Sequence, residues 1–135
     1  MVDAPPSIHP CLFYRDANAA ITWLNAAFGF ETVMNVPAPD GGVAHAELRF
    51  GPAIIMVYSA KADSMSPRDL PGHNQSNYVY LPGIRAHYER AKAAGVEIVR
   101  EYEEHDYGGA GYSAVDIEGH QWSFGSYLPG EPSTT

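Results

Sequence analysis

The first half of the chain changes between two hydrophobic periods. Strands are predicted over residues 7–14, 30–36, 43–50 and 53–59; residues 43–50 alternate strictly, and 53–59 form an apolar run. Between the first two strands, apolar side chains recur at three- and four-residue steps, which predicts a helix over residues 17–28 with one buried stripe. Asp16 precedes this helix as its N-cap, and Gly29 follows it as its C-terminal stop.

The second half repeats this order. Strands are predicted over residues 77–81, 96–102, 111–115 and 122–127. A helix is predicted over residues 83–94, and its apolar stripe passes through Ile84, Tyr88, Ala91 and Ala94. His87, a polar residue of the same helix, is expected to face solvent. The segments FGFETV (28–33) and AGVEIV (94–99) superpose with a shift of 66 residues.

An internal repeat at half the chain length outranks any local signal. We therefore predict an α+β fold made of two tandem βαβββ halves, at about residues 7–59 and 76–127. Residues 60–75 contain Pro67, Pro71 and Gly72 among polar residues, so they are predicted to be a linker. A length of 135 residues is typical of a single domain, which we assign to residues 1–135.

The predicted strand 43–50 has two distinct faces. Strict alternation places Val43, His45 and Glu47 on the side opposite Ala46 and Leu48. One interpretation is a solvent-exposed or interface face stabilised by cross-strand pairs. The other is a cavity wall on which Glu47 binds a cation or a substrate amine.

The stretch DIEGHQWSFGSY (116–127) begins as a turn and continues as a strand. Gly119 suits the turn because glycine adopts positive φ without penalty. In the strand, large aromatic side chains alternate with small ones. Trp122 and Phe124 are therefore predicted in the core, and Ser123 is predicted on the other face.

Composition and charge exclude several classes of protein. Sixteen Asp plus Glu against eight Lys plus Arg give a net charge of −8, which disfavours nucleic-acid binding. No apolar run approaches the roughly 20 residues of a membrane span. The N-terminus lacks the basic and apolar regions of a signal peptide, so we expect a cytoplasmic protein that binds no membrane.

The sequence gives little support to nucleophilic or nucleotide chemistry. Cys11 is the single cysteine, so no intrachain disulfide forms, and we expect a buried, inert thiol. The glycines of GGAG (108–111) lie between two strands rather than between a strand and a helix, which is the wrong context for a phosphate loop. No GxSxG motif is present.

The repeat resembles the vicinal oxygen chelate superfamily, which contains glyoxalase I, extradiol dioxygenases and bleomycin-resistance proteins. The resemblance is carried by YRDANAAITWLNAAFGFE (14–31), VAHAELRFG (43–51) and DIEGHQWSFGSY (116–127). It implies that each half curls a mixed sheet into a cup, with the helices on the convex side. It also implies a homodimer, since many members pair two chains to complete their cavities.

The resemblance further implies four candidate metal positions. They fall on His9, on Met56 (Ile55 if the register slips by one), on Gln75 or Ser76, and on Ser123. In glyoxalase-like members the last position is usually a glutamate. Divalent transition metals favour carboxylate and imidazole ligands. This chain keeps one strong ligand, so we expect no cofactor. If a metal binds, its ligands are predicted to be His9, Gln75 and Glu47.

Aromatic richness favours a ligand-binding function. Nine tyrosines and two tryptophans suit a cavity that holds a flat guest by stacking and a few hydrogen bonds. The predicted cavity residues are His9, His45, Glu47, Met56, Tyr58, Gln75, Tyr112 and Ser123. The leading hypothesis is a homodimeric protein that sequesters a planar, antibiotic-like or cationic small molecule, as metal-poor bleomycin-resistance-like proteins do. The alternative is a metal-dependent lyase, isomerase or dioxygenase with an atypical ligand set.

Overall fold

The computed structural model describes residues 4–61, 66–69, 75–106 and 108–130. The elements follow the predicted order of two βαβββ modules, separated by a short 3₁₀ helix, Pro67–Asp69. The chain divides into two compact units. The first comprises Met1–Asn25 and Gly29–Ser64, and the second comprises Ala26–Phe28 and Met65–Thr135. The predicted α+β class with two tandem modules is confirmed, and each module contains one open four-stranded mixed sheet.

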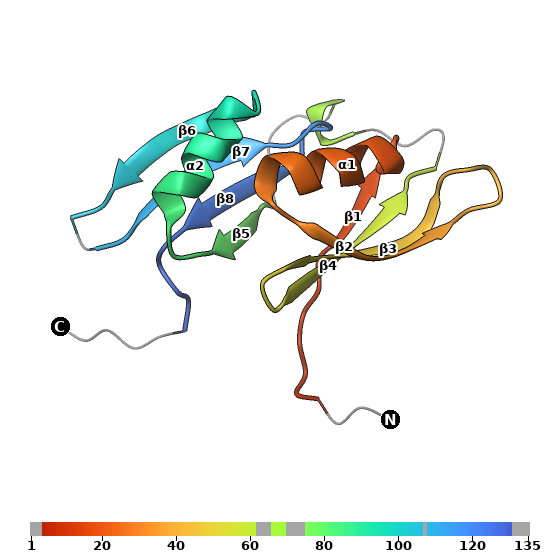
Figure 1. The fold of residues 1–135 in the computed structure, drawn as a ribbon, viewed down its shortest axis with the longest axis horizontal. Helices are drawn as coiled ribbons and strands as arrows, with labels where there is room; N and C mark the ends of the chain where they lie inside the picture. Colours follow the sequence, from red (N-terminus) through yellow and green to blue (C-terminus); the bar gives the residue numbers. More distant parts are fainter. Residues whose placement is uncertain (1–3, 62–65, 70–74, 107, 131–135) are drawn as a thin grey trace. The chain divides into compact units, whose positions relative to one another are not determined.

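The first unit holds β1 to β4 and most of α1. These elements are β1 (Cys11–Tyr14), α1 (Ala17–Phe28), β2 (Glu31–Pro37), β3 (Val43–Phe50) and β4 (Ala53–Ser59). The sheet has the strand order β1-β4-β3-β2 (Figure 1). β1 pairs with β4 in parallel, and the other two pairs are antiparallel.

Local chemistry sets the ends of α1 and the start of β1. The Asp16 side chain accepts a hydrogen bond from the Ala19 N–H at 3.0 Å, which caps the helix as predicted. Gly29 ends the helix in the left-handed conformation, with φ of 86°. β1 begins at Cys11 rather than at the predicted Ser7. Pro10 has no N–H to donate, which limits extension of the strand toward the N-terminus.

Two expectations for the first unit are wrong. Cys11 is exposed, because the alternation of β1 buries its neighbours Leu12 and Tyr14 instead. Val43 is buried, on the same side as Ala46, and so does not share a face with His45. Val36 pairs with His45 whereas Pro37 pairs with Val43, so β3 carries one extra residue and the alternation reverses there.

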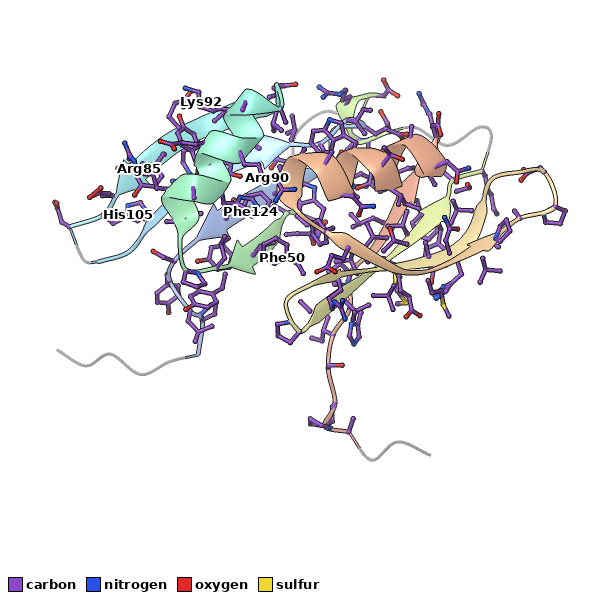
Figure 2. The ribbon with its side chains drawn as sticks, in the orientation of Figure 1. Phe50, Arg85, Arg90, Lys92, His105 and Phe124 are labelled. Carbon is purple, nitrogen blue, oxygen red and sulfur yellow. The ribbon has the colours of Figure 1, made fainter. Side chains whose placement is uncertain are left out.

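The second unit holds the remaining elements. They are β5 (Asn77–Tyr80), α2 (Ile84–Ala93), β6 (Glu97–Glu104), β7 (Ala110–Val115) and β8 (Gln121–Gly125). Its sheet has the order β5-β8-β7-β6, with β5 parallel to β8. α2 lies across this sheet (Figure 1). On its exposed side, Arg85 and Lys92 lie over the rings of Tyr102 and Tyr88, at 4.9 Å and 5.4 Å from the ring centroids (Figure 2).

The core of the second unit is aromatic and contains a histidine. Trp122 and Phe124 are buried as predicted. His87 is only 8% exposed, which overturns its predicted place in solvent. Its Nε2–H donates to the Phe28 carbonyl at 2.8 Å, which leaves Nδ1 to accept the Tyr112 hydroxyl at 2.7 Å. Both ring nitrogens are thus satisfied, which makes burial of this polar side chain acceptable.

Burial also sets the ionisation of this pair. Desolvation lowers the pKa of His87; the nearby Arg90 lowers it further, and the hydrogen bond with Phe28 opposes the shift. Burial raises the pKa of the Tyr112 hydroxyl. Both groups are therefore held neutral, as their shared hydrogen bond requires.

The predicted linker contacts the second unit through Arg68. Residues 62–65 and 70–74 of it lie outside the described part of the chain. Arg68 donates to the Asp116 carbonyl at 3.1 Å and forms an ion pair with Glu97 at 3.0 Å. A side chain at Gly119 would meet the Arg68 backbone nitrogen at 2.9 Å, so this turn needs a glycine for space as well as for its φ of 96°. None of the helices in the described ranges is long and apolar enough to span a membrane.

Candidate ligand-binding site

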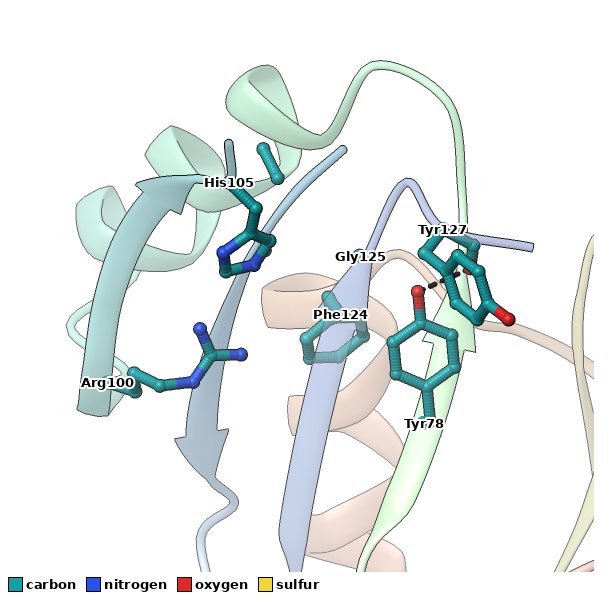
Figure 3. A pocket seen from close by; sticks show the side chains of 8 residues that line it. Tyr78, Arg100, His105, Phe124, Gly125 and Tyr127 are labelled. Carbon is teal, nitrogen blue, oxygen red and sulfur yellow. Dashed lines mark hydrogen bonds between the residues drawn. The ribbon is translucent and has the colours of Figure 1, made fainter. Parts of the chain in front are cut away.

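The second unit contains a pocket of about 290 Å³. It lies at the ends of β7 and β8 (Figure 3). Its lining residues are Tyr78, Arg100, His105, Ala110, Gly111, Phe124, Gly125 and Tyr127. This volume is just below the range of about 300–1,000 Å³ that is usual for small-molecule sites.

Two glycines form the floor of the pocket. Gly111 and Gly125 are directly paired across β7 and β8. Neither adopts a positive φ, so backbone conformation does not demand glycine at either position. A Cβ at Gly125 would lie 2.6 Å from the Tyr78 hydroxyl, and one at Gly111 would lie 2.8 Å from the Phe124 carbonyl oxygen. Neither position therefore has room for a side chain without a local shift, as expected where a strand glycine marks a close approach.

One wall of the pocket is aromatic. The Tyr78 hydroxyl donates to the Tyr127 carbonyl at 2.5 Å, which ties β5 to the segment after β8. Tyr78 and Tyr127 remain 44% and 59% exposed. Their rings are thus available to stack on a flat molecule.

The opposite wall is polar and comes from β6 and the turn after it. Arg100 and His105 point toward the same space in Figure 3. Nε of Arg100 donates to the Ser113 hydroxyl at 3.3 Å, and the Ser113 and Ser123 hydroxyls are hydrogen-bonded at 2.8 Å. Ser123, which was predicted to face a cavity, therefore belongs to the polar group that supports Arg100.

Four of the predicted site residues come together on the open side of the first unit's sheet. His45 Nε2 lies 2.8 Å from a Glu47 carboxylate oxygen, which only accepts, so Nε2 carries the proton. His45 Nδ1 lies 3.1 Å from the Tyr58 hydroxyl. That hydroxyl also lies 3.6 Å from the Met56 sulfur. The His45 and Glu47 side chains are about one-third exposed, at 30% and 32%, so this is a cross-strand polar cluster that solvent reaches.

His9 and Gln75 are each engaged in hydrogen bonds within their own unit. His9 is exposed and uses both ring nitrogens, with the Ile54 carbonyl at 2.9 Å and the Ser7 hydroxyl at 2.7 Å. Gln75 donates to the Asn77 side chain at 3.2 Å.

The strand register distinguishes between Gln75 and Ser76 as the second-half counterpart of His9. Cys11 pairs with Met56, and Tyr78 pairs with Ser123. The counterpart of His9, two residues before Cys11, is therefore Ser76 rather than Gln75.

Tyr112 does not face an open cavity, contrary to expectation. It is completely buried on the helix side of β7. It stacks on Phe124 with ring centroids 5.2 Å apart and bonds to His87. The alternation of β7 causes this, because Gly111 and Ser113 occupy the open side.

The model of the glyoxalase/bleomycin resistance protein/dioxygenase superfamily matches residues 7–124. The chain belongs to this superfamily.

Individual superfamily relatives support the assignment. The chain is 30% identical over 129 residues to the uncharacterized protein Mb0911c of Mycobacterium bovis, and the match covers 92% of this chain and 85% of that one. The crystal structure of TioX from Micromonospora sp. ML1 is similar with a TM-score of 0.71 and 31% identity, covering 90% of this chain and 100% of TioX. The fosfomycin resistance protein FosX from Listeria monocytogenes shares the fold with a TM-score of 0.66 at 15% identity, covering 95% of this chain and 94% of FosX.

Two of the four metal positions implied by the superfamily hold residues that do not fit a divalent ion. Met56 offers a thioether and Ser123 a neutral hydroxyl, where such a site needs carboxylates to offset the charge. Ser123 is also engaged with Ser113. Within the described part of the chain, no group of three or more His, Cys, Asp or Glu is placed to hold a metal ion.

Sequence reasoning missed the residues that make the pocket in this superfamily member. Arg100, His105 and Tyr127 gave no motif, since they are brought together by pairing of distant strands. The available signal was Gly111 and Gly125, two glycines inside predicted strands. Such glycines mark a close approach of a ligand or another chain segment.

Proposed function

We propose that this protein binds a small planar organic molecule in the pocket of its second unit and does not transform it. The observation that carries the proposal is the paired glycine floor of Gly111 and Gly125 beneath the exposed rings of Tyr78 and Tyr127. An apolar, concave surface with a few polar groups is the usual form of a small-molecule site. Sequestration of an aromatic, antibiotic-like compound is the function that we propose, as in bleomycin-resistance-type proteins.

Two tyrosines on β5 provide a matched test. Tyr78 and Tyr80 are similarly exposed, at 44% and 40%, but only Tyr78 lines the pocket. We would titrate neutral, anionic and cationic planar aromatic compounds into the wild type, Tyr78→Ala and Tyr80→Ala by isothermal titration calorimetry. Loss of one stacking ring costs about 1–3 kcal/mol, so Tyr78→Ala should weaken binding by roughly 5- to 150-fold. Tyr80→Ala should change it less than twofold.

Either of two results would overturn the proposal. One is that no compound in the panel binds the wild type. The other is that Tyr78→Ala and Tyr80→Ala have the same affinity for every compound that binds.

We also propose that binding needs no metal, because Met56 and Ser123 stand at positions where carboxylates would be required. Elemental analysis of the purified protein should find no stoichiometric Ni, Zn, Mn or Fe. A requirement for added Mn²⁺ or Fe²⁺ in the titrations would instead favour the metal-dependent enzyme, with Glu47 among the ligands to test.

A further inference from the structure

The pocket of the second unit has a charge opposite to that of the whole protein. Arg100 and His105 are its ionisable basic residues, and none of the eight lining residues is an aspartate or glutamate. The chain as a whole has sixteen acidic residues against eight Lys plus Arg. A basic wall in such a chain suits an anionic group on the ligand.

We propose that the pocket selects planar aromatic acids, with the carboxylate on Arg100 and the ring system against Tyr78 and Tyr127. This inference rests on the proposed function and names the ligand class. Figure 3 shows the two ends of the pocket, with Arg100 and His105 on one side and the two tyrosines on the other. A molecule with a flat body and one charged end matches this division.

The guanidinium of Arg100 is positioned for a carboxylate. Nε is occupied by the Ser113 hydroxyl, and Nη2 lies 3.6 Å from where a Gly111 Cβ would be, directly over the glycine floor. Among the described residues, Arg100 has no carboxylate in ion-pair contact. Its remaining N–H groups can form the parallel pair of hydrogen bonds that arginine makes with carboxylates.

The hydroxyl at Ser123 keeps Arg100 available. Ser123 bonds to Ser113, which accepts from Arg100. A carboxylate at position 123 would stand within this same chain of contacts and would neutralise the guanidinium. Ser123 therefore has two effects. It replaces the glutamate that binds metal in glyoxalase-like members, and it leaves the Arg100 guanidinium able to bind an anionic ligand.

A bulge in β6 brings one acidic side chain near the site. Arg100 pairs with Ser113 and Glu103 pairs with Gly111, so β6 has one extra residue between them. Glu103 is exposed and is not part of the lining. It opposes binding of an anion from outside the pocket, and Glu103→Gln should leave affinity for a carboxylate unchanged or raise it.

The test compares two ligands of the same shape. We would measure 2-naphthoate and its neutral analogue 2-naphthamide by isothermal titration calorimetry at fixed ionic strength. A bidentate, charge-assisted contact predicts that the wild type binds 2-naphthoate about 10- to 100-fold more tightly. Arg100→Gln and Ser123→Asp should abolish this preference by weakening the binding of 2-naphthoate. Arg100→Lys should retain part of it, because the charge stays and the fork is lost.

Arg85→Gln is the matched control, since it removes the same charge from the exposed side of α2 in the same unit. It should keep the full preference, which separates a local contact from the field of the whole protein. Circular dichroism of each variant checks the fold.

Equal affinity for the acid and the amide, or a preference that survives Arg100→Gln, would overturn the inference. If both ligands bind in a manner sensitive to Tyr78→Ala, the proposed function stands while the inference fails. If neither naphthoate, naphthamide nor any compound of the wider panel binds, both fall together.

Discussion

His87 and Tyr112 form the buried hydrogen-bonded pair around which the aromatic core of the second unit is packed. The two side chains contact each other and Phe124, and their ionisation is shifted so that both stay neutral. Protonation of His87 would place a charge among aromatic rings and remove the acceptor that the Tyr112 hydroxyl uses.

The lowered pKa of His87 makes stability depend on pH in a defined direction. The unfolded chain takes up this proton near pH 6.5, but the folded chain resists it. The free energy of unfolding therefore keeps the full contribution of neutral His87 above pH 6.5. It falls as the pH decreases toward the pKa of His87 in the folded protein, by at most about 1.4 kcal/mol per pH unit. Urea unfolding between pH 7.5 and 5 should show this loss.

The control for this titration is a non-ionising side chain. His87→Gln should flatten the pH dependence, and His9→Gln, at an exposed position, should not. An equal slope in wild type and His87→Gln would show that other groups cause the acid sensitivity.

Whether a side chain faces the core or the solvent could be predicted from the sequence only where the hydrophobic repeat of its helix or strand continued without interruption. Trp122 and Phe124 were placed correctly because β8 alternates regularly. His87 was misplaced because its polar side chain suggested solvent, although it lies in the stripe of Ile84 and Ala91. Its buried partners come from distant segments, and no local pattern reveals them.

At the scale of elements, the turn between β7 and β8 is organised by one buried carboxylate. Asp116 is 1% exposed. One of its oxygens accepts the N–H groups of Glu118 and His120, at 3.1 and 3.0 Å, and the other accepts the Trp122 indole N–H at 3.1 Å. A single side chain thus fixes both the turn and the ring at the start of β8.

Asp116→Asn should destabilise the protein by about 1–3 kcal/mol. An amide has one oxygen, so its NH₂ group must face either the indole N–H or the turn N–H groups, and a buried donor is left unsatisfied. Chemical unfolding measures the loss. Asp40→Asn is the control, because exposed Asp40 accepts the Gly42 N–H with one oxygen, which leaves the other for an amide NH₂ in solvent, and it should change stability by less than about 0.5 kcal/mol. Similar losses in both variants would contradict this account.

The order of helices and strands could be predicted because the hydrophobic repeats of helix and strand recur in both halves. The pocket could not be predicted in this way. Its floor depends on the register that sets Gly111 opposite Gly125, and its polar wall on a bulge that aims Arg100 at the open side. Register and bulges are fixed by tertiary packing, so the sequence alone marks the glycines without indicating what they face.

At the scale of the whole molecule, the two outer antiparallel edges differ in chemistry. Every residue of β2 is exposed, including the large apolar side chains Val33, Met34 and Val36. β6, at the edge of the other sheet, carries four glutamates among its eight residues. Charged edges resist strand pairing, and apolar edges favour it. An association of two chains would therefore use β2 rather than β6.

We predict a homodimer in solution that depends on β2. Three large apolar side chains on an exposed edge favour association, and a charge among them opposes it through desolvation. Light scattering should give about twice the chain mass of 14.7 kDa for the wild type and the monomer mass for Met34→Glu/Val36→Glu.

Val99→Glu is the matched control. Val99 on β6 is as exposed, at 52%, as Val33 on β2, at 49%, but it lies on the charged edge. It should remain a dimer. A wild type that stays monomeric across a wide concentration range, or a Val99→Glu variant that dissociates as readily as the β2 variant, would show that the apolar edge does not hold two chains together.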